Sequence, residues 1–385
     1  MSYTVTEIAA AGYRSLRAIR FPLRRLSVFV GANGAGKTNL YRALQLIQAA
    51  AAGNLSRTLA AEGGMDSALW AGKRQARKPP RIKLMAALGD ADDGGGDATT
   101  PAYSYAIEIG LRACTEAAFA VEPLIKEEAL LLHRGPRQTS LLERRGPAVF
   151  ARDIEGRRAA LDHELMASQT ALSAIEDPPR FPDLYMLRRT MLDWRFYHDF
   201  RTDPEAPLRQ PCLAVATPTL SSDAGDLAAV LATLVHIRED TDDLDQAVTD
   251  AFAGARLVVP GPGRTASFGM AFAEHPQRVF EAGELSDGTL RYLGLMGALL
   301  AYRLPALIAL NEPEASLHPE LLPPLARLIA KAAERTQIWV VTHSQTLAAA
   351  LEEHAGVKPM TVIKRAGETW IEGLRLGGGF RDEEE

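Results

Sequence analysis

Gly31-Ala-Asn-Gly-Ala-Gly-Lys37-Thr38 is the stretch that decides the fold, because it matches the phosphate-loop pattern G-x-x-x-x-G-K-[ST]. An apolar run over residues 26–30 predicts a strand entering the loop, and residues 39–47 predict a helix leaving it. The glycines let successive backbone N–H groups turn toward a phosphate, and the helix start adds a partial positive charge. The stretch therefore predicts a nucleoside triphosphate site.

The side chains of this loop have separate predicted roles. The Lys37 ammonium can reach the terminal phosphates, and the Thr38 hydroxyl can bind the magnesium that accompanies the nucleotide. The residues expected to contact the nucleotide are Gly31, Asn33, Gly34, Ala35, Gly36, Lys37 and Thr38.

Composition limits the class of protein. The 385 residues are 47% hydrophobic and 24% charged, as in an ordinary soluble globular protein. The net charge of −5 gives no broad attraction for nucleic acid, so DNA binding would need a local basic patch. Cys114 and Cys212 lie far apart and are expected to be buried thiols of a reducing cytosol. With no leader pattern and no unbroken apolar span, we expect a cytoplasmic protein without a membrane partner.

Hydrophobic periodicity predicts an α/β fold, with strands and helices alternating in the last third of the chain. In the first third, the expected strands cover residues 4–8, 16–21, 82–88 and 103–111. In the last third we expect a helix over 290–302, a strand over 306–310, a helix from about 319, a strand over 338–342 and a hairpin over 360–374.

The middle of the chain differs in composition. Helices are expected near 161–175 and over 222–235, and no sustained apolar heptad predicts a long coiled coil. We therefore expect a composite phosphate-loop lobe of residues 1–121 and 275–376, an inserted lobe of residues 122–274 and a disordered tail of residues 377–385.

Asn311-Glu-Pro-Glu follows the apolar run 306–310. A buried strand that ends in acidic residues beside a phosphate loop is the Walker B arrangement. Residue 311 would hold magnesium through a water molecule, and Glu312 would polarise the attacking water. Asn311 lacks the negative charge of an aspartate, which predicts weaker magnesium retention and slower turnover. Taken alone, Glu-Pro-Glu could equally be an acidic turn without a catalytic role.

Two further segments complete the expected site. Ser286 and Gly288 precede a helix, where backbone amides and a hydroxyl can bind an anion, although such a segment alone is an ordinary helix cap. His343 follows the strand 338–342 and can contact a γ-phosphate, although a lone histidine there is more often structural. The order of the four motifs favours the functional interpretation of both.

The four motifs together resemble the ABC-type ATPases of the RecF/SMC group, and within it the predicted AAA-family ATPases that lack a long coiled coil. Residues 8–17 resemble that group's opening strand and turn, residues 311–319 its joined Walker B and D-loop, and residues 220–231 its middle lobe. The resemblance implies a P-loop NTPase of the ABC/SMC head type, with a mixed sheet and an inserted, mainly helical lobe.

The resemblance also implies a mechanism. It implies a magnesium-dependent ATPase with ATP and Mg2+ as cofactors, Thr38 and Asn311 toward the metal, and Glu312 and His343 as catalytic residues. Two copies would dimerise around two ATP molecules, each gripped by the partner's Ser286–Gly288 loop. The chain departs from the group at Asn311. No Q-loop glutamine is identified, since Gln45 and Gln75 both fit poorly.

Three functions are compatible with these motifs. The first is an ATP-switched protein that acts on DNA in repair or phage defence, with phosphate contacts from the basic loop 73–81 and from the arginines of residues 134–158. Arginines in such runs are solvated surface residues at least as often as they are DNA contacts. The second is a regulatory ATPase that controls a separate effector, such as a nuclease. The third, an ABC transporter subunit, is disfavoured by the large lobe between Lys37 and Ser286.

Overall fold

A computed structural model describes residues 3–73, 79–90, 102–111, 122–161, 165–238, 241–375 and 377–380. The chain divides into two compact units. Unit 1 contains Met1–Arg24, Gly31–Trp194 and Met360–Glu385, and unit 2 contains Arg25–Val30 and Arg195–Pro359.

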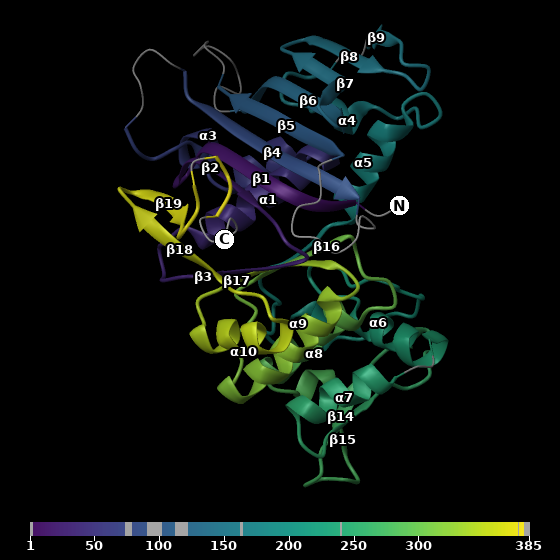
Figure 1. The fold of residues 1–385 in the computed structure, drawn as a ribbon. Helices are drawn as coiled ribbons and strands as arrows, with labels where there is room; N and C mark the ends of the chain where they lie inside the picture. The colour runs from purple at the N-terminus through teal and green to yellow at the C-terminus, as the bar shows by residue number, and fades with distance from the viewer. Residues whose placement is uncertain are drawn as a thin grey trace. The chain divides into compact units, whose positions relative to one another are not determined.

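Unit 1 is built on an antiparallel sheet with the strand order β2-β1-β4-β5-β6-β7-β8-β9 (Figure 1). Alternation of buried and half-buried residues along β1 and β5 gives one face of the sheet to the core. The strands are β1 Tyr3–Tyr13, β2 Leu16–Pro22, β4 Arg81–Asp90, β5 Tyr103–Gly110, β6 Leu124–Arg134, β7 Arg137–Arg145, β8 Ala148–Arg152 and β9 Arg158–Ala160.

Helices and one hairpin complete unit 1. The long helix α1 (Lys37–Ala52) ends at Gly53, which adopts φ of +80° and donates its backbone N–H to Ala50. The shorter helices are α2 Leu55–Ala61, α3 Gly64–Ala68, α4 Ala171–Ala174 and α5 Pro182–Asp193. The hairpin consists of β18 (Met360–Arg365) and β19 (Glu368–Ile371), which pair antiparallel as expected.

Unit 2 contains a parallel sheet in the order β10-β16-β17-β3. Every residue of β3, β16 and β17 is buried, which explains why these strands appear in the sequence as largely apolar runs. The strands are β3 Leu26–Val30, β10 Arg195–Tyr197, β16 Leu307–Asn311 and β17 Gln337–Thr342. The strand expected to enter the phosphate loop and the two expected in the last third are thus confirmed.

Helices α6 to α10 supply much of the hydrophobic core of unit 2. They are α6 Leu227–Thr233, α7 Asp242–Ala251, α8 Asp287–Leu300, α9 Leu322–Ala333 and α10 Gln345–Ala355. A π-helix, Leu234–Arg238, continues α6. Single-turn helices cover Pro207–Arg209, Ala282–Glu284 and Pro319–Leu321, and short strands are β11 Cys212–Leu213, β12 Arg256–Val258, β13 Thr265–Ala266, β14 Gly269–Ala271 and β15 Val279–Glu281.

The middle of the chain differs from expectation. Strands β6 to β9 continue the antiparallel sheet of unit 1 through residues 124–160, where a mainly helical lobe was expected. The helix expected over 161–175 is wrong, because only Ala171–Ala174 is α-helical among the described residues of that segment. The two units therefore do not coincide with the expected lobes of residues 1–121 with 275–376 and of residues 122–274.

Three smaller expectations concern the tail, the thiols and the membrane. Of the tail, residues 377–380 are described, and Phe380 forms a bridge with Leu374; residues 381–385 lie outside the described part. Cys212 is a half-buried free thiol, and Cys114 lies outside the described residues. No helix in the described part of the chain has the length and apolar character that a membrane span needs.

Candidate active site

The phosphate loop lies in unit 1 and closes on its own lysine. Helix α1 begins at Lys37, and Gly36 before it adopts φ of +98°, a conformation that favours glycine. The buried Lys37 donates its Nζ–H groups to the carbonyl oxygens of Gly31 (2.6 Å) and Ala32 (3.1 Å). The loop is therefore curved around the ammonium group that would face a phosphate.

A hydroxyl cluster supports the loop from unit 1. Thr369 donates its Oγ1–H to the carbonyl of Ala35 (2.9 Å), and its Oγ1 lies 2.6 Å from Ser15 Oγ. Asn39, on α1, donates its Nδ2–H to Ser15 Oγ at 2.6 Å. A Cβ on Gly36 would overlap Thr369 Oγ1. The sequence predicted no role for Ser15, although it lies in the opening turn of residues 8–17, or for Thr369, which is far from the loop in the chain.

One side of the phosphate loop is open. A Cβ added to Gly34, which has φ of +80°, would meet no atom within 4 Å. Asn33 and Gly34 are exposed, Thr38 is half-buried at the start of α1, and Ala35 is buried. Consecutive loop amides next to a helix N-terminus are groups that can bind an anion, and binding by these residues stays a prediction.

Asn311 is the last residue of β16 in unit 2, and only 1% of its surface is exposed. Its Nδ2–H is donated to His198 Nδ1 at 2.6 Å, just beyond the end of β10. Its Oδ1 is buried and has no hydrogen-bond partner among the described residues. A buried, unpaired amide oxygen is costly unless a ligand occupies it, and oxygen is the donor atom that Mg2+ prefers.

The turn after β16 is strained and carries the two glutamates. Glu312 adopts φ of +51°, and its backbone N–H is donated to Val341 O at 2.7 Å. Its side chain is 35% exposed. Such a backbone in a residue with a Cβ costs about 1–3 kcal/mol and is found most often at functional sites.

His343 lies beside both glutamates of that turn. His343 Nδ1 is 4.0 Å from Glu312 Oε2 but only 3.1 Å from Glu314 Oε1. The sequence predicted catalytic roles for Glu312 and His343 and no role for Glu314. The buried Glu314 is the nearer partner, and only the fold reveals this because the two residues are far apart in sequence.

Ser286 caps helix α8 in unit 2, as the sequence predicted, and its Oγ accepts the backbone N–H of Thr289 at 3.2 Å. Arg209 holds the preceding segment, donating to Gly283 O (3.1 Å), Leu285 O (2.8 Å) and Asp287 Oδ1 (2.5 Å). Ser286 is exposed and Gly288 is half-buried. The loop is therefore firmly anchored while its polar groups remain accessible.

The strand register of unit 2 brings the site residues of that unit to one edge. Asn311 pairs with Val341, and Thr342 pairs with Val30, so β16, β17 and β3 end at nearly the same level. Gly31 follows Val30 directly in the chain and begins the phosphate loop. The carboxyl edge of a parallel sheet is where ligands bind in open α/β folds.

Most of the arginine-rich stretch is engaged within unit 1. Arg144 is only 2% exposed and donates to the carbonyl of Gly146 (2.9 Å) and to that of Gln169. The paired or hydrogen-bonded members are Arg144, Arg145, Arg152, Arg157 and Arg158. Arg134 and Arg137, at the exposed turn between β6 and β7, are the two remaining candidates for DNA contact within that stretch. Of the basic loop 73–81, residues 74–78 lie outside the described part.

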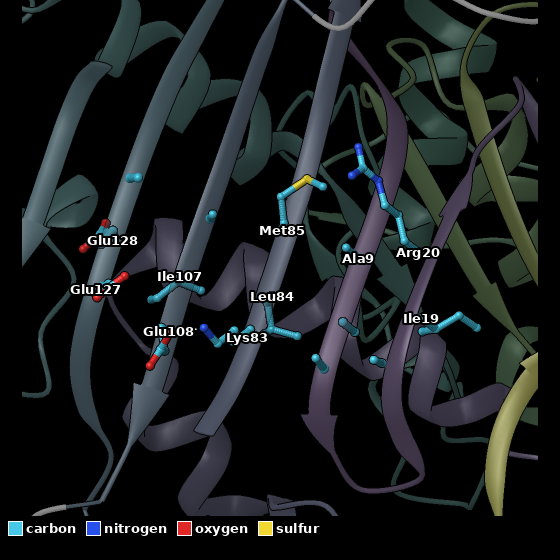
Figure 2. Close-up of a pocket in the computed structure, with 15 residues that line it drawn as sticks. Ala9, Ile19, Arg20, Lys83, Leu84, Met85, Ile107, Glu108, Glu127 and Glu128 are labelled. Atoms are coloured by element: carbon cyan, nitrogen blue, oxygen red, sulfur yellow. Dashed lines mark ion pairs between the residues drawn. The ribbon is translucent and has the colours of Figure 1, made fainter. Parts of the chain in front are cut away.

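A hollow of about 500 Å3 on the sheet of unit 1 does not belong to this site (Figure 2). It is lined by small side chains such as Ala9 and Ala106 and by the ion pair of Lys83 with Glu108, 2.6 Å apart. No residue predicted for the site lines it. Of the two glutamines considered for a Q-loop, Gln45 lies on α1 and Gln75 lies outside the described residues.

Comparison with known proteins identifies both family and fold. Residues 26–349 match the family described as "AAA domain, putative AbiEii toxin, Type IV TA system". No curated protein matches the chain. It is similar to a crystal structure of an SMC head bound to the C-winged helix domain of ScpA, with a TM-score of 0.54 and 14% identity over 97% of this chain and 98% of that chain.

A second solved structure gives the same result. It is an Smc head domain with an extended coiled coil, bound to the C-terminal domain of ScpA derived from Pyrococcus furiosus. The TM-score is 0.51, with 13% identity over 97% of each chain. These likenesses show the P-loop NTPase fold of the SMC-head type, as the sequence predicted.

Proposed function

This chain belongs to the AAA-domain family that matches residues 26–349, and from that premise we propose a magnesium-dependent ATPase that dimerises on ATP and acts on DNA. The observation that carries the proposal is the shared edge at which β16, β17 and β3 end. Asn311 ends β16, His343 follows β17, and the phosphate loop follows β3. The nucleotide-binding residues of the proposal are Gly31, Asn33, Gly34, Ala35, Gly36, Lys37 and Thr38.

Thr38 and Asn311 would hold the magnesium ion. The unpaired, buried Oδ1 of Asn311 supports this assignment, because it supplies an oxygen without a competing hydrogen bond in the described part of the chain. Bound magnesium would neutralise charge on the phosphates. A neutral amide attracts the cation less strongly than a carboxylate, so we expect weaker magnesium binding than an aspartate would give.

Glu312 would polarise the attacking water, and His343 would contact the γ-phosphate. Both side chains are partly exposed, as groups that meet a substrate must be. The test is ATP hydrolysis with and without magnesium for the natural protein and Glu312→Gln. Glu320→Gln is the matched control, because the Glu320 side chain is 89% exposed outside the proposed site. Hydrolysis that survives in Glu312→Gln would contradict the role of Glu312.

Dimerisation would place the Ser286–Gly288 loop of one copy on the γ-phosphate bound by the other. The exposed Ser286 hydroxyl on an anchored loop supports this arrangement. Sizing of Glu312→Gln with ATP, ADP or no nucleotide tests it, because blocked hydrolysis should trap the ATP state as a dimer. A protein that stays monomeric with ATP would refute this mechanism.

Action on DNA, in repair or phage defence, is the least supported part of the proposal, with Arg134 and Arg137 as its candidate contacts. We expect binding to fall steeply with salt and to weaken in the Arg134→Glu/Arg137→Glu double variant. Arg201→Glu is the control, because the exposed Arg201 is already paired with Asp203 in unit 2. No binding at low salt with ATP present would eliminate the DNA function.

The second candidate function is a regulatory ATPase that controls a separate effector in the cytoplasm. The family description, which names a toxin–antitoxin system, favours a protein partner. ATPase activity without DNA binding, together with a partner that co-purifies in an ATP-dependent manner, would favour this function over the first.

A further inference from the structure

Glu314 is a buried carboxylate in the turn after β16, and it contacts the residues that precede helix α10. Its side chain is 5% exposed, and its Oε1 accepts hydrogen bonds from Thr342 Oγ1 (2.6 Å), His343 N (2.9 Å) and Ser344 N (3.2 Å). His343 Nδ1 lies 3.1 Å from the same oxygen. One carboxylate oxygen thus accepts a hydrogen bond from the backbone of His343 and lies close to the ring of the same residue.

The two glutamates of the turn differ in what they can reach. The Glu312 side chain is 35% exposed and its Oε2 is 4.0 Å from His343 Nδ1, which is beyond hydrogen-bond distance. Glu314 is nearer to the ring but is closed off from solvent. Glu312 can therefore meet a water molecule or a nucleotide, whereas Glu314 can act only through other residues.

We propose that Glu314 is a positioning residue that accepts the Nδ1–H of His343 and so directs Nε2 of that ring outward, toward the γ-phosphate. A neutral imidazole has one N–H, and a partner that accepts it decides which nitrogen is left for the substrate. The His343 side chain is 44% exposed, and in the described part of the chain its polar contacts are made by Nδ1 and by the backbone N–H. The expected effect on ATP hydrolysis rests on the proposed function, but the tautomer of His343 can be observed without any turnover.

A purely structural role is the competing explanation, because the same oxygen also binds two backbone N–H groups ahead of α10. Thr342→Val separates the two roles. It removes one hydrogen bond to Glu314 Oε1, together with the Thr342 Oγ1–Ser344 N contact of 2.9 Å, and leaves the imidazole contact in place. Glu314→Gln removes the charge but keeps an oxygen that can accept a backbone N–H.

The first experiment measures the 15N shifts of histidine rings in the full-length, nucleotide-free protein at about pH 8.5, above the usual titration range of histidine. His343 is assigned by the signal missing from His343→Gln. We expect the proton on Nδ1 in the natural protein and in Thr342→Val, and a shift toward the Nε2–H form in Glu314→Gln. A natural protein with the proton on Nε2 would overturn the proposal, whatever the variants do.

The second experiment is a double-mutant cycle on ATP hydrolysis. We expect Glu314→Gln to lower kcat roughly 10- to 100-fold with KM nearly unchanged, the range seen for partners that orient a functional histidine. In the His343→Ala background the same change should have no further effect, because its target is gone. If Glu314→Gln lowers kcat by the same factor with and without His343, its role is structural and the proposal is overturned. If the natural protein has no ATPase activity, the proposed function is refuted. The tautomer measurement would still test whether Glu314 accepts the Nδ1–H of His343.

Discussion

Replacing Gly36 by alanine should damage the phosphate loop far more than the same change at Gly34. Both glycines have positive φ, +98° and +80°, so each substitution costs about 1–2 kcal/mol from the left-handed backbone alone. At Gly34 the new Cβ meets nothing within 4 Å. At Gly36 it overlaps Thr369 Oγ1 and lies 2.7 Å from Ser15 Oγ, and such overpacking costs a further ~1–3 kcal/mol.

The assay is thermal unfolding without nucleotide, followed by titration with a fluorescent ATP analogue. A destabilisation of 1 kcal/mol lowers the melting temperature by roughly 2–4 °C in a unit of this size. Gly36→Ala should therefore melt clearly below Gly34→Ala. Adding Thr369→Ala to Gly36→Ala should recover part of the difference, since it removes the overlapping hydroxyl. Equal melting temperatures for the two single variants, or no recovery in the double variant, would refute the steric reasoning.

Three other changes probe separate parts of the molecule. Asn311→Asp should raise kcat and lower the magnesium concentration needed for half-maximal hydrolysis, because it adds a negative charge at the proposed metal site; an unchanged magnesium titration would show that the amide suffices. Arg209→Met should weaken ATP-dependent dimerisation without changing ATP affinity, because it releases the segment before Ser286; sizing and nucleotide titration measure the two effects separately. Burial raises the pKa of Glu128, so the folded protein retains a proton that the unfolded chain loses, and stability should fall as the pH rises above the ordinary glutamate value of about 4.3. Melting curves from pH 4 to 7 should show this fall in the natural protein and not in Glu128→Gln.

The central strands of unit 2 could be predicted from sequence because their residues are largely apolar. Residues 26–30 and 306–310 were predicted as strands because both faces of each strand are buried and Ser27 is the one polar residue within the two runs. The helix after Lys37 followed from the glycine-rich loop before it.

Strands β6 and β7 were missed because charged residues occupy buried positions in them. Glu128 is 1% exposed and accepts hydrogen bonds from Tyr105 Oη and from the backbone N–H groups of Ala171 and Leu172. Arg144, on β7, is buried near it. These polar groups are satisfied by residues distant in the chain, so a hydrophobic pattern alone could not place them on an inward face.

The candidate site shows the same division between local and distant information. Motif spacing predicted Lys37, Asn311, Glu312 and His343, whose roles depend on residue type and on a strand or helix end. The partners that hold them, such as Thr369 for the loop and Glu314 for His343, lie 334 and 28–30 residues away from the groups they bind. Such partners became visible only in the folded chain.

The division of the chain into units has a consequence for protein engineering. Unit 2 draws its strand β3 from Arg25–Val30, long before its main segment Arg195–Pro359. A fragment that begins at Arg195 would lose β3 and leave one edge of the largely apolar strand β17 unpaired, which is a template for aggregation. Unit 2 could be produced alone only by joining residues 25–30 to that fragment through a linker. Such a permutation would separate β3 from the phosphate loop that follows it in the natural chain.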